Sequence, residues 1–257
     1  MIISQHYRYV FVEVPNTGCT AVAKALVEQC GGQKILTKHA TYGEFLRFAS
    51  ADEKKYYVFG SVRNPLDAIV SVYWKLKHNH KGAFTRSGPR PWWSNSNVLR
   101  QQFEFIHHND ADFRSYFFQF VRKVYNNNYL LLHERFNRIM RFETLSINFM
   151  ETLREIGVAN VVDLPHVNRT EGKSDFLNSY SPDMYRQAAR CFGPYMRKWG
   201  YAFPNEWGDV SIPNLSHIRF ATMDRMGSLA AKRLSVGPNS HGRLLGLIRK
   251  GIRRIWA

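Results

Sequence analysis

The sequence is poor in cysteine and in acidic residues, and it contains no long hydrophobic run. Its three cysteines, Cys19, Cys30 and Cys191, are odd in number and widely spaced, which argues against a disulfide framework and leaves no zinc-ligand spacing. No apolar stretch approaches the roughly 18–20 residues that a membrane-spanning helix needs. A strand-like segment begins almost at the first residue, so we expect no signal peptide or membrane anchor there. These absences predict a soluble, cytoplasmic protein of a reducing compartment.

Positive charge, by contrast, is abundant. Lys and Arg total 36 against 20 Asp and Glu, which gives a net charge of +16 at pH 7. Such a surplus favours anionic partners, namely nucleotide phosphates, nucleic acid, acidic glycans or anionic lipid, without choosing among them. A basic nucleic-acid-binding protein is therefore one hypothesis, although the sequence shows no recognition motif with the usual spacing. With 257 residues, 44% of them hydrophobic, the chain can bury a substantial core.

Strands and helices alternate along the first part of the chain. Residues 9–14 (YVFVEV) are typical of a buried strand, and after a short turn residues 21–30 are typical of a helix. A second unit begins with a strand at 56–59 and enters a helix where Asn64 is the expected N-cap and Pro65 the first helical residue. This alternation predicts an α/β fold, a single domain with a central, mainly parallel sheet flanked by helices.

The following segments continue the pattern. We expect a helical region, a short strand, an amphipathic helix and a last helix, over residues 103–125, 139–142, 145–153 and 182–199. The amphipathic helix places Leu145, Phe149 and Leu153 on one face. The aromatic residues of the first region are expected in the core, in particular Phe113, Phe117, Phe118 and Phe120.

The character of the chain changes after Phe203. Residues 204–241 are rich in Pro, Gly, Ser and Asn and show no long periodic stretch. We therefore divide the chain into a domain at 1–203 and a linker with a basic tail at 204–257. Residues 243–256 are typical of an amphipathic helix that lies on an anionic membrane, here the inner face of the membrane. The alternative is a helix packed on its own domain or on a partner.

Two turns carry the residue types that bind phosphate. A glycine-containing turn between a strand and a helix presents backbone N–H groups at the positive end of the helix dipole. The first such turn lacks the Gly-Lys-[Ser/Thr] ending of a Walker loop, and an ordinary capped connection is the alternative. It comprises Pro15, Asn16, Thr17, Gly18, Cys19 and Thr20.

The second turn adds a permanent positive charge. Arg63 follows a strand and Ser71 lies eight residues later in the next helix. Arginine binds a phosphate through two parallel hydrogen bonds, and a serine hydroxyl adds a third donor. The alternative is that Arg63 satisfies backbone carbonyls. Two such turns on one sheet predict a ligand with phosphates at both ends.

These segments resemble a known family in the family's own order. The first turn and its helix, YVFVEVPNTGCTAVAKAL, resemble the 5′-phosphosulfate-binding segment of sulfotransferases that use 3′-phosphoadenosine 5′-phosphosulfate (PAPS). The second, YYVFGSVRNPLDAIVSVYWKL, is similar to their 3′-phosphate-binding segment. RFETLSINFMETLREIG, PHVNRT and YRQAARCFGPYMRKWGYAF resemble later segments of carbohydrate-type and bacterial members. The resemblance covers about residues 7–203.

The resemblance implies a P-loop-like sulfotransferase fold and a set of site residues. The first turn would cradle the 5′-phosphosulfate, and Arg63 and Ser71 would hold the 3′-phosphate. Phe142 stands where relatives often have a tyrosine near the adenine. Arg169 or Lys173 would add charge late in the chain. Sulfuryl transfer in this family needs no metal.

Asn16 departs from the family pattern. Most relatives have Lys or Arg directly after the proline of the first turn, where the charge stabilises the transferring group. An amide donates a hydrogen bond but carries no charge. Either backbone amides and another cation, Lys24 or Lys38, compensate for it, or the chain is a weak or inactive relative that binds the nucleotide only.

The acceptor hydroxyl needs a general base, and three residues are candidates. His39 corresponds to the catalytic histidine of some glycan-modifying members, and a neutral imidazole accepts a proton near pH 7. Glu44 is the second candidate because other glycan sulfotransferases use a glutamate, and Glu13 is the third. The resulting hypothesis is a PAPS-dependent O-sulfotransferase acting on a carbohydrate or glycolipid hydroxyl, with His39 as base and Asn16 beside the transferring group. A nucleotide-binding pseudoenzyme is the rival.

Overall fold

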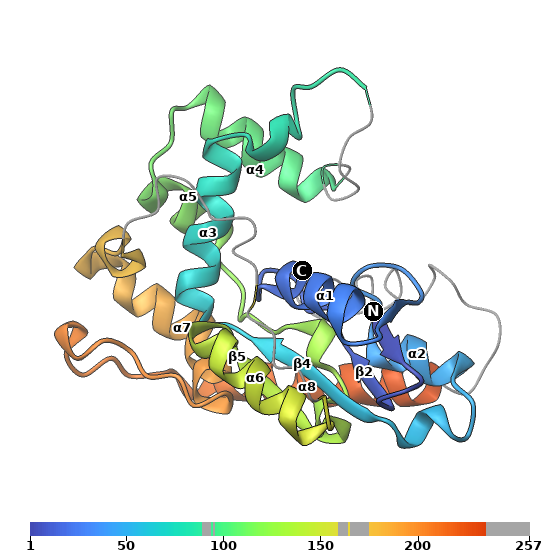
Figure 1. Cartoon of the computed structure of the whole chain (residues 1–257). Helices are drawn as coiled ribbons and strands as arrows, with labels where there is room; N and C mark the ends of the chain where they lie inside the picture. The colour runs from blue at the N-terminus through green and yellow to red at the C-terminus, as the bar shows by residue number, and fades with distance from the viewer. Residues whose placement is uncertain (89–93, 95, 159–163, 165–174, 235–257) are drawn as a thin grey trace. The chain divides into compact units, whose positions relative to one another are not determined.

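The computed structural model describes residues 1–88, 94, 96–158, 164 and 175–234 (Figure 1). They form two compact units. The first comprises Met1–Arg63, Asn126–Val167 and Arg219–Ala257, and the second comprises Asn64–Tyr125 and Asn168–Ile218.

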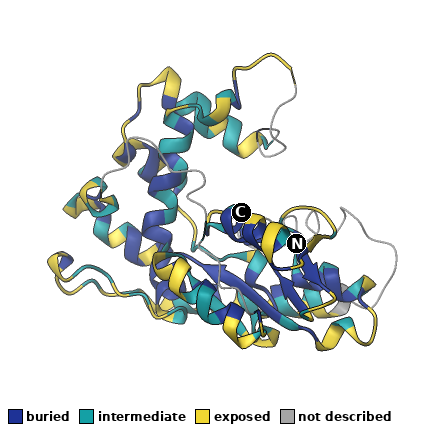
Figure 2. Ribbon diagram, viewed as in Figure 1, coloured by how far each residue is buried: buried dark blue, intermediate teal, exposed yellow. Residues whose placement is uncertain are grey.

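A five-stranded sheet forms the centre of the first unit. In spatial order β3-β1-β2-β4-β5, its strands are β3 (Gln33–Lys34), β1 (Ile2–Ser4), β2 (Tyr9–Phe11), β4 (Tyr57–Val62) and β5 (Arg138–Arg141). β4 is parallel to both β2 and β5, with Phe11 opposite Phe59 and Val62 opposite Arg141. Nearly every residue of β2 and β4 is buried (Figure 2).

The expectation of a mainly parallel sheet needs correction, because β1 is antiparallel to both β2 and β3 and the sheet is mixed. Only residues 5–8 connect β1 to β2. A parallel connection needs a dozen or more residues, so these two strands form a hairpin. The α/β class and the parallel centre of the sheet agree with the sequence.

Helices α1 (Cys19–Gln29) and α6 (Leu145–Glu155) share one hydrophobic cluster with the sheet. The expected apolar face of α6 is confirmed, since Leu145, Phe149 and Leu153 are all buried in this cluster. The unit also contains α2 (Tyr42–Phe48), whose Gly43 approaches Ala231 of α8 (Asn214–Leu234).

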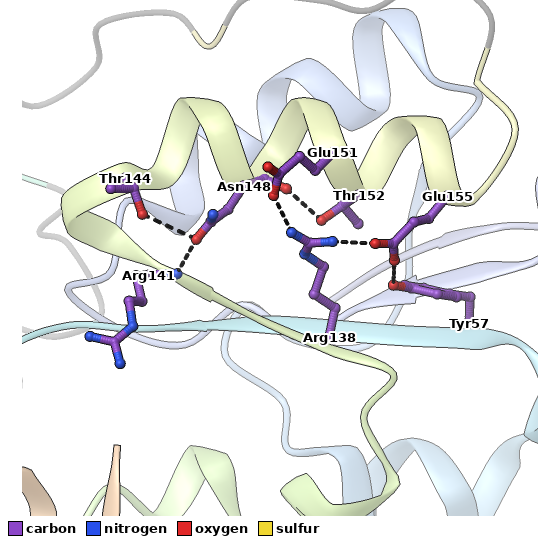
Figure 3. Close-up of polar contacts among 8 residues, drawn as sticks. All are labelled: Tyr57, Arg138, Arg141, Thr144, Asn148, Glu151, Thr152 and Glu155. Atoms are coloured by element: carbon purple, nitrogen blue, oxygen red, sulfur yellow. Dashed lines mark hydrogen bonds and ion pairs between the residues drawn. The ribbon is translucent and has the colours of Figure 1, made fainter. Parts of the chain in front are cut away.

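Charged side chains fix α6 to the strands beneath it (Figure 3). Arg138 of β5 forms ion pairs with Glu151 and Glu155 of α6, and Glu155 also accepts a hydrogen bond from Tyr57 of β4. Near the start of α6, Asn148 Oδ1 accepts from the backbone N–H of Arg141 at 2.8 Å. These contacts hold β5 at both ends, through Arg138 at its amino end and Arg141 at its carboxyl end.

The second unit is helical and has its own aromatic core. Its helices are α3 (Pro65–Lys77), α4 (Asn97–His108), α5 (Phe113–Phe120) and α7 (Pro182–Lys198). The expected start of α3 is confirmed: Asn64 Oδ1 accepts from the N–H of Leu66, and Pro65 is the first helical residue. The expected helical region 103–125 is instead two helices, because Asp112 caps a new helix by accepting from the N–H of Ser115.

Short 3₁₀ turns connect these elements, at Glu53–Lys55, His80–Gly82, Asn128–Leu130, His133–Arg135, Phe142–Thr144, Phe176–Ser179 and Asn205–Trp207.

α8 was not expected from the sequence. It occupies 21 residues of the segment in which no long periodic stretch was found. Its buried face contains Ser216, Phe220 and Gly227, which are mostly small residues, so the usual hydrophobic signal of a core-facing helix is weak. The expected tail helix at 243–256 lies outside the described residues. Within the described part of the chain, none of the helices is both long and apolar enough to cross a membrane.

Candidate functional site

The turn between β2 and α1 has an unusual backbone. Asn16 and Gly18 both have a positive φ, of 63° and 74°, in the left-handed region that Gly and Asn tolerate best. α1 begins at Cys19 with no acidic residue in its first turn, so its N-terminus keeps the positive end of the helix dipole. A Cβ on Gly18 would lie 2.6 Å from Leu145 Cδ2 and 3.3 Å from the ring of Phe142. Glycine therefore fits this position without backbone strain and without displacing Leu145.

The hydroxyl of Thr17 is used inside the protein. Thr17 Oγ1 donates to the backbone carbonyl of Val14 at 2.8 Å and lies 2.6 Å from Ser61 Oγ of β4. Because the single Thr17 proton goes to Val14, Ser61 is the donor in their contact. Both side chains are buried. The Thr17 side chain therefore attaches the turn to β4, and its hydroxyl proton is used within the protein.

Arg63 lies against the same turn from the end of β4. Its guanidinium donates to the backbone carbonyl of Asn16 at 2.9 Å and stacks on the ring of Phe142, with Cζ 4.0 Å from the ring centre. Phe142 in turn lies beside Gly18. Arg63 is 8% exposed, so its charge is held largely out of water, where an electrostatic contact with an anion is stronger.

His39 is fixed beside the strand that leads into the turn. Its Nδ1 lies 2.6 Å from the backbone carbonyl oxygen of Glu13, and its ring meets Tyr129 edge-on at 6.0 Å. A carbonyl only accepts, so Nδ1 carries the proton and Nε2 of the neutral ring is the basic atom. Burial is the main cause that lowers the pKa of His39 from its ordinary value of 6.5, although the bond to Glu13 opposes it. The ring is therefore neutral at pH 7.

A lysine side chain reaches the turn from outside it. Lys38 Nζ donates to Thr20 Oγ1 at 3.0 Å. Since the Thr20 oxygen accepts this bond, its own proton can be donated to a further acceptor. Lys24 lies farther along α1 and is exposed. Of the two cations expected to replace the charge missing at Asn16, Lys38 is the one with a hydrogen bond to the turn.

Other residues expected at the site have different surroundings. The Glu44 carboxylate accepts from the N–H and hydroxyl of Thr41 in a capping box at the start of α2. The Glu13 carboxylate is paired at 2.6 Å with the Met1 ammonium group. Ser71 is buried on α3, in the second unit. Arg169 and Lys173 lie outside the described residues.

Two cavities of the described residues are lined by other parts of the chain. One, of about 360 Å³, is lined by residues of the second unit that include Phe176 and Phe203. The other, of about 340 Å³, is lined by residues of the first unit that include Lys54 and Arg135. Neither is lined by Arg63, by His39 or by residues of the first turn.

Sequence comparison places the chain in a family. A protein-family model described as Sulfotransferase family matches residues 1–197, which is most of the chain. The chain therefore belongs to the sulfotransferase family, whose members are transferases that move a sulfuryl group from a sulfate donor to a hydroxyl acceptor. A search of curated proteins and a search of solved structures each found no match.

One supporting residue was missed by the sequence analysis. Ser61 interrupts the apolar run of β4 with a buried hydroxyl that bonds to the turn. A polar residue inside an otherwise buried strand was the available signal, because a buried hydroxyl needs a hydrogen-bonding partner.

Proposed function

We propose that this sulfotransferase moves the sulfuryl group of PAPS to a hydroxyl of a carbohydrate or glycolipid acceptor. One observation carries the proposal. A proton-accepting His39, the Lys38 ammonium and the Arg63 guanidinium all approach the strand–turn–helix formed by β2, the first turn and α1. The three groups match a base, a cation for the departing phosphate and a cation for the nucleotide.

The nucleotide would be held mainly by fixed donors. The N–H groups at the start of α1 lie at the positive end of the helix dipole and suit the 5′-phosphosulfate. Arg63 is already oriented by Asn16 and Phe142, so little conformational freedom is lost when it binds a phosphate. The family resemblance adds Ser71 at the 3′-phosphate. Phe142 offers an aromatic face and no hydroxyl.

The transfer step needs one proton acceptor and stabilisation of one leaving oxygen. His39 Nε2 takes the proton of the acceptor hydroxyl as that oxygen attacks sulfur in line. The bond between sulfur and the bridging phosphate oxygen breaks, and 3′-phosphoadenosine 5′-phosphate (PAP) leaves with the added negative charge. Lys38, the Thr20 hydroxyl and the turn amides stabilise that charge on the leaving oxygen. Positioning and preorganised electrostatics supply most of the rate in such a step.

Labelled PAPS offered with an extract of glycans and glycolipids tests the proposal. We expect label in an acceptor with the unaltered chain and a loss of about 10²–10⁴ in rate with His39→Ala. PAP affinity should change only a few-fold in that variant. If Glu44→Gln abolishes transfer and His39→Ala does not, the base is Glu44.

A second candidate function follows from Asn16, which lacks the usual charge. A binding-only relative would hold PAP and transfer no label to any acceptor.

Calorimetry separates both candidate functions, transfer and binding only, from an unrelated nucleotide site. We expect micromolar-range binding of PAP, much weaker binding of ATP, and loss of most PAP affinity in Arg63→Ala, since a charged hydrogen bond contributes about 1.5–3 kcal/mol. Equal binding of ATP would contradict both candidates.

A further inference from the structure

Exposed apolar side chains concentrate on one helix. Among the described residues, eight large hydrophobic side chains are exposed, and four of them belong to α8, with exposed fractions between 46% and 62%. These four are Leu215, Ile218, Met226 and Leu229. Single exposed hydrophobic residues are common on protein surfaces, but a gathered set marks a contact surface.

The four side chains lie on one face of α8. Together with Thr222 they follow the spacing 3, 4, 4 and 3, so they fall within an arc of about 80° and extend over about 21 Å of helix. We call these five residues the α8 outer face. The buried residues Ser216, Phe220 and Gly227 lie on the opposite side. The usual arrangement of a surface helix is reversed, because the apolar stripe points outward.

The charge that α8 itself places beside this face is positive. Arg225 and Lys232 lie along one flank of the stripe and are both exposed, with Lys232 Nζ 3.3 Å from Glu134 Oε1. The one acidic residue of α8, Asp224, lies two positions from both Thr222 and Met226 and so points to another side. From Arg225 to the last residue, the sequence contains eight Lys or Arg and no Asp or Glu.

We propose that the α8 outer face docks on an anionic membrane surface. The apolar side chains enter the boundary between headgroups and acyl chains, and the flanking cations meet the lipid phosphates. A second copy of the chain is a poorer occupant. Pairing two outer faces would bring Arg225 and Lys232 of one copy toward the same cations of the other, and the face itself carries no acidic residue to offset the repulsion. Nucleic acid would use the cations and leave the apolar stripe in water. The proposal does not depend on the transfer reaction.

Flotation of the full chain with lipid vesicles tests this. The probes are vesicles of phosphatidylcholine with phosphatidylserine, and of phosphatidylcholine alone. The test variant is Ile218→Ser/Met226→Ser/Leu229→Ser, and the matched control is Phe48→Ser/Val98→Ser/Ile147→Ser, which changes three comparably exposed apolar residues on other helices. Every protein keeps the basic tail, so a difference between the two variants reports on α8. Exposed substitutions of this kind change stability little, and circular dichroism verifies the fold.

We expect the unaltered chain and the control to float with the anionic vesicles, less so at high salt, and the test variant to bind at least about tenfold more weakly. Arg225→Glu should weaken binding to the anionic vesicles alone. The proposal is overturned if the unaltered chain floats with neither vesicle, or if the test variant binds as well as the control. It is equally overturned if the chain binds a single-stranded polyribonucleotide and the anionic vesicles alike with no effect of the serine substitutions.

Discussion

The Nδ1 atom of His39 lies 2.6 Å from the backbone carbonyl oxygen of Glu13. This contact assigns the ring proton to Nδ1 and makes Nε2 the basic atom. It also attaches the histidine to the main chain of the segment that leads into the first turn, so the position of the imidazole follows the position of the turn. His39 has a positive φ of 63°, a conformation that costs a non-glycine residue of the order of 1 kcal/mol.

The first prediction concerns pH. Because burial lowers the pKa of His39 below 6.5, the transfer rate should remain high down to that lower pKa and fall as His39 becomes protonated. Between that lower pKa and pH 6.5, His39 binds a proton in the unfolded chain but not in the folded chain. The contribution of His39 therefore lowers the free energy of unfolding as the pH falls below 6.5. Heteronuclear NMR of the imidazole should show a proton on Nδ1 at neutral pH. A midpoint above 6.5 would contradict this account.

The second prediction separates the two lysines. If the departing phosphate binds at the first turn as proposed, Lys38→Met should reduce the transfer rate by about 10²–10³, since it removes a donor bonded to Thr20 of that turn. Lys24→Met, which removes the same charge from an exposed position of α1, is the matched control and should leave the rate within about twofold. Single-turnover kinetics with labelled PAPS gives both values. Equal losses would mean that overall charge, rather than the Lys38 contact, is responsible.

The third prediction compares two glycines that share a positive φ. Gly157→Ala places a Cβ in open space at φ 79°, so it should cost only the backbone term of about 1 kcal/mol. Gly18→Ala adds the overlap with Leu145 Cδ2 and should lower the free energy of unfolding by a further 1–3 kcal/mol or so. Urea denaturation measures the difference. PAP affinity should fall in the Gly18 variant only, and similar stabilities would show that the turn relaxes around the new methyl group.

The fourth prediction concerns Asn16. Asn16→Lys places an ordinary residue at φ 63° and should cost about 1 kcal/mol of stability, while Asn16→Gly should cost less. If Lys38 already supplies the positive charge, Asn16→Lys changes the transfer rate modestly. A gain from no activity to measurable activity would instead identify the natural chain as a binding-only relative. Labelled-PAPS assays on both variants distinguish these results.

Signals from neighbouring residues predicted much of this fold. Contacts between residues far apart in the sequence explain most of the places where the structure differs from the prediction. The Asn64 cap, the Pro65 start and the apolar face of α6 depend on neighbouring residues, so they could be read from spacing alone. β1 is three residues long and exists through its pairing with β2 and β3, which no local pattern records. α8 was missed although its exposed apolar residues recur at helical spacing, because the segment around it is rich in Pro, Gly, Ser and Asn and its buried face contains mostly small residues.

The candidate site shows the same division. Arg63 and the first turn were identified from residue type and position, and the structure brings them together through Asn16. The two hydrogen bonds of Thr17 depend on the backbone of Val14 and on Ser61, a residue 44 positions away. The choice between Lys24 and Lys38 likewise required knowing which side chain reaches the turn. The residue types show which hydrogen-bond donors the chain has, but tertiary contacts determine which acceptor each donor meets.

The stacking of Arg63 on Phe142 has a consequence for how the protein is made. The two residues are far apart in the sequence, and Phe142 directly follows β5, the last strand along the described part of the chain. A growing chain that ends before β5 can pair β1, β2 and β4, yet the arginine then lacks the ring that orients it. Affinity for the proposed nucleotide would thus appear late in folding, after a long-range contact of the kind that slows folding. A bound nucleotide would in turn stabilise the completed sheet over its precursors.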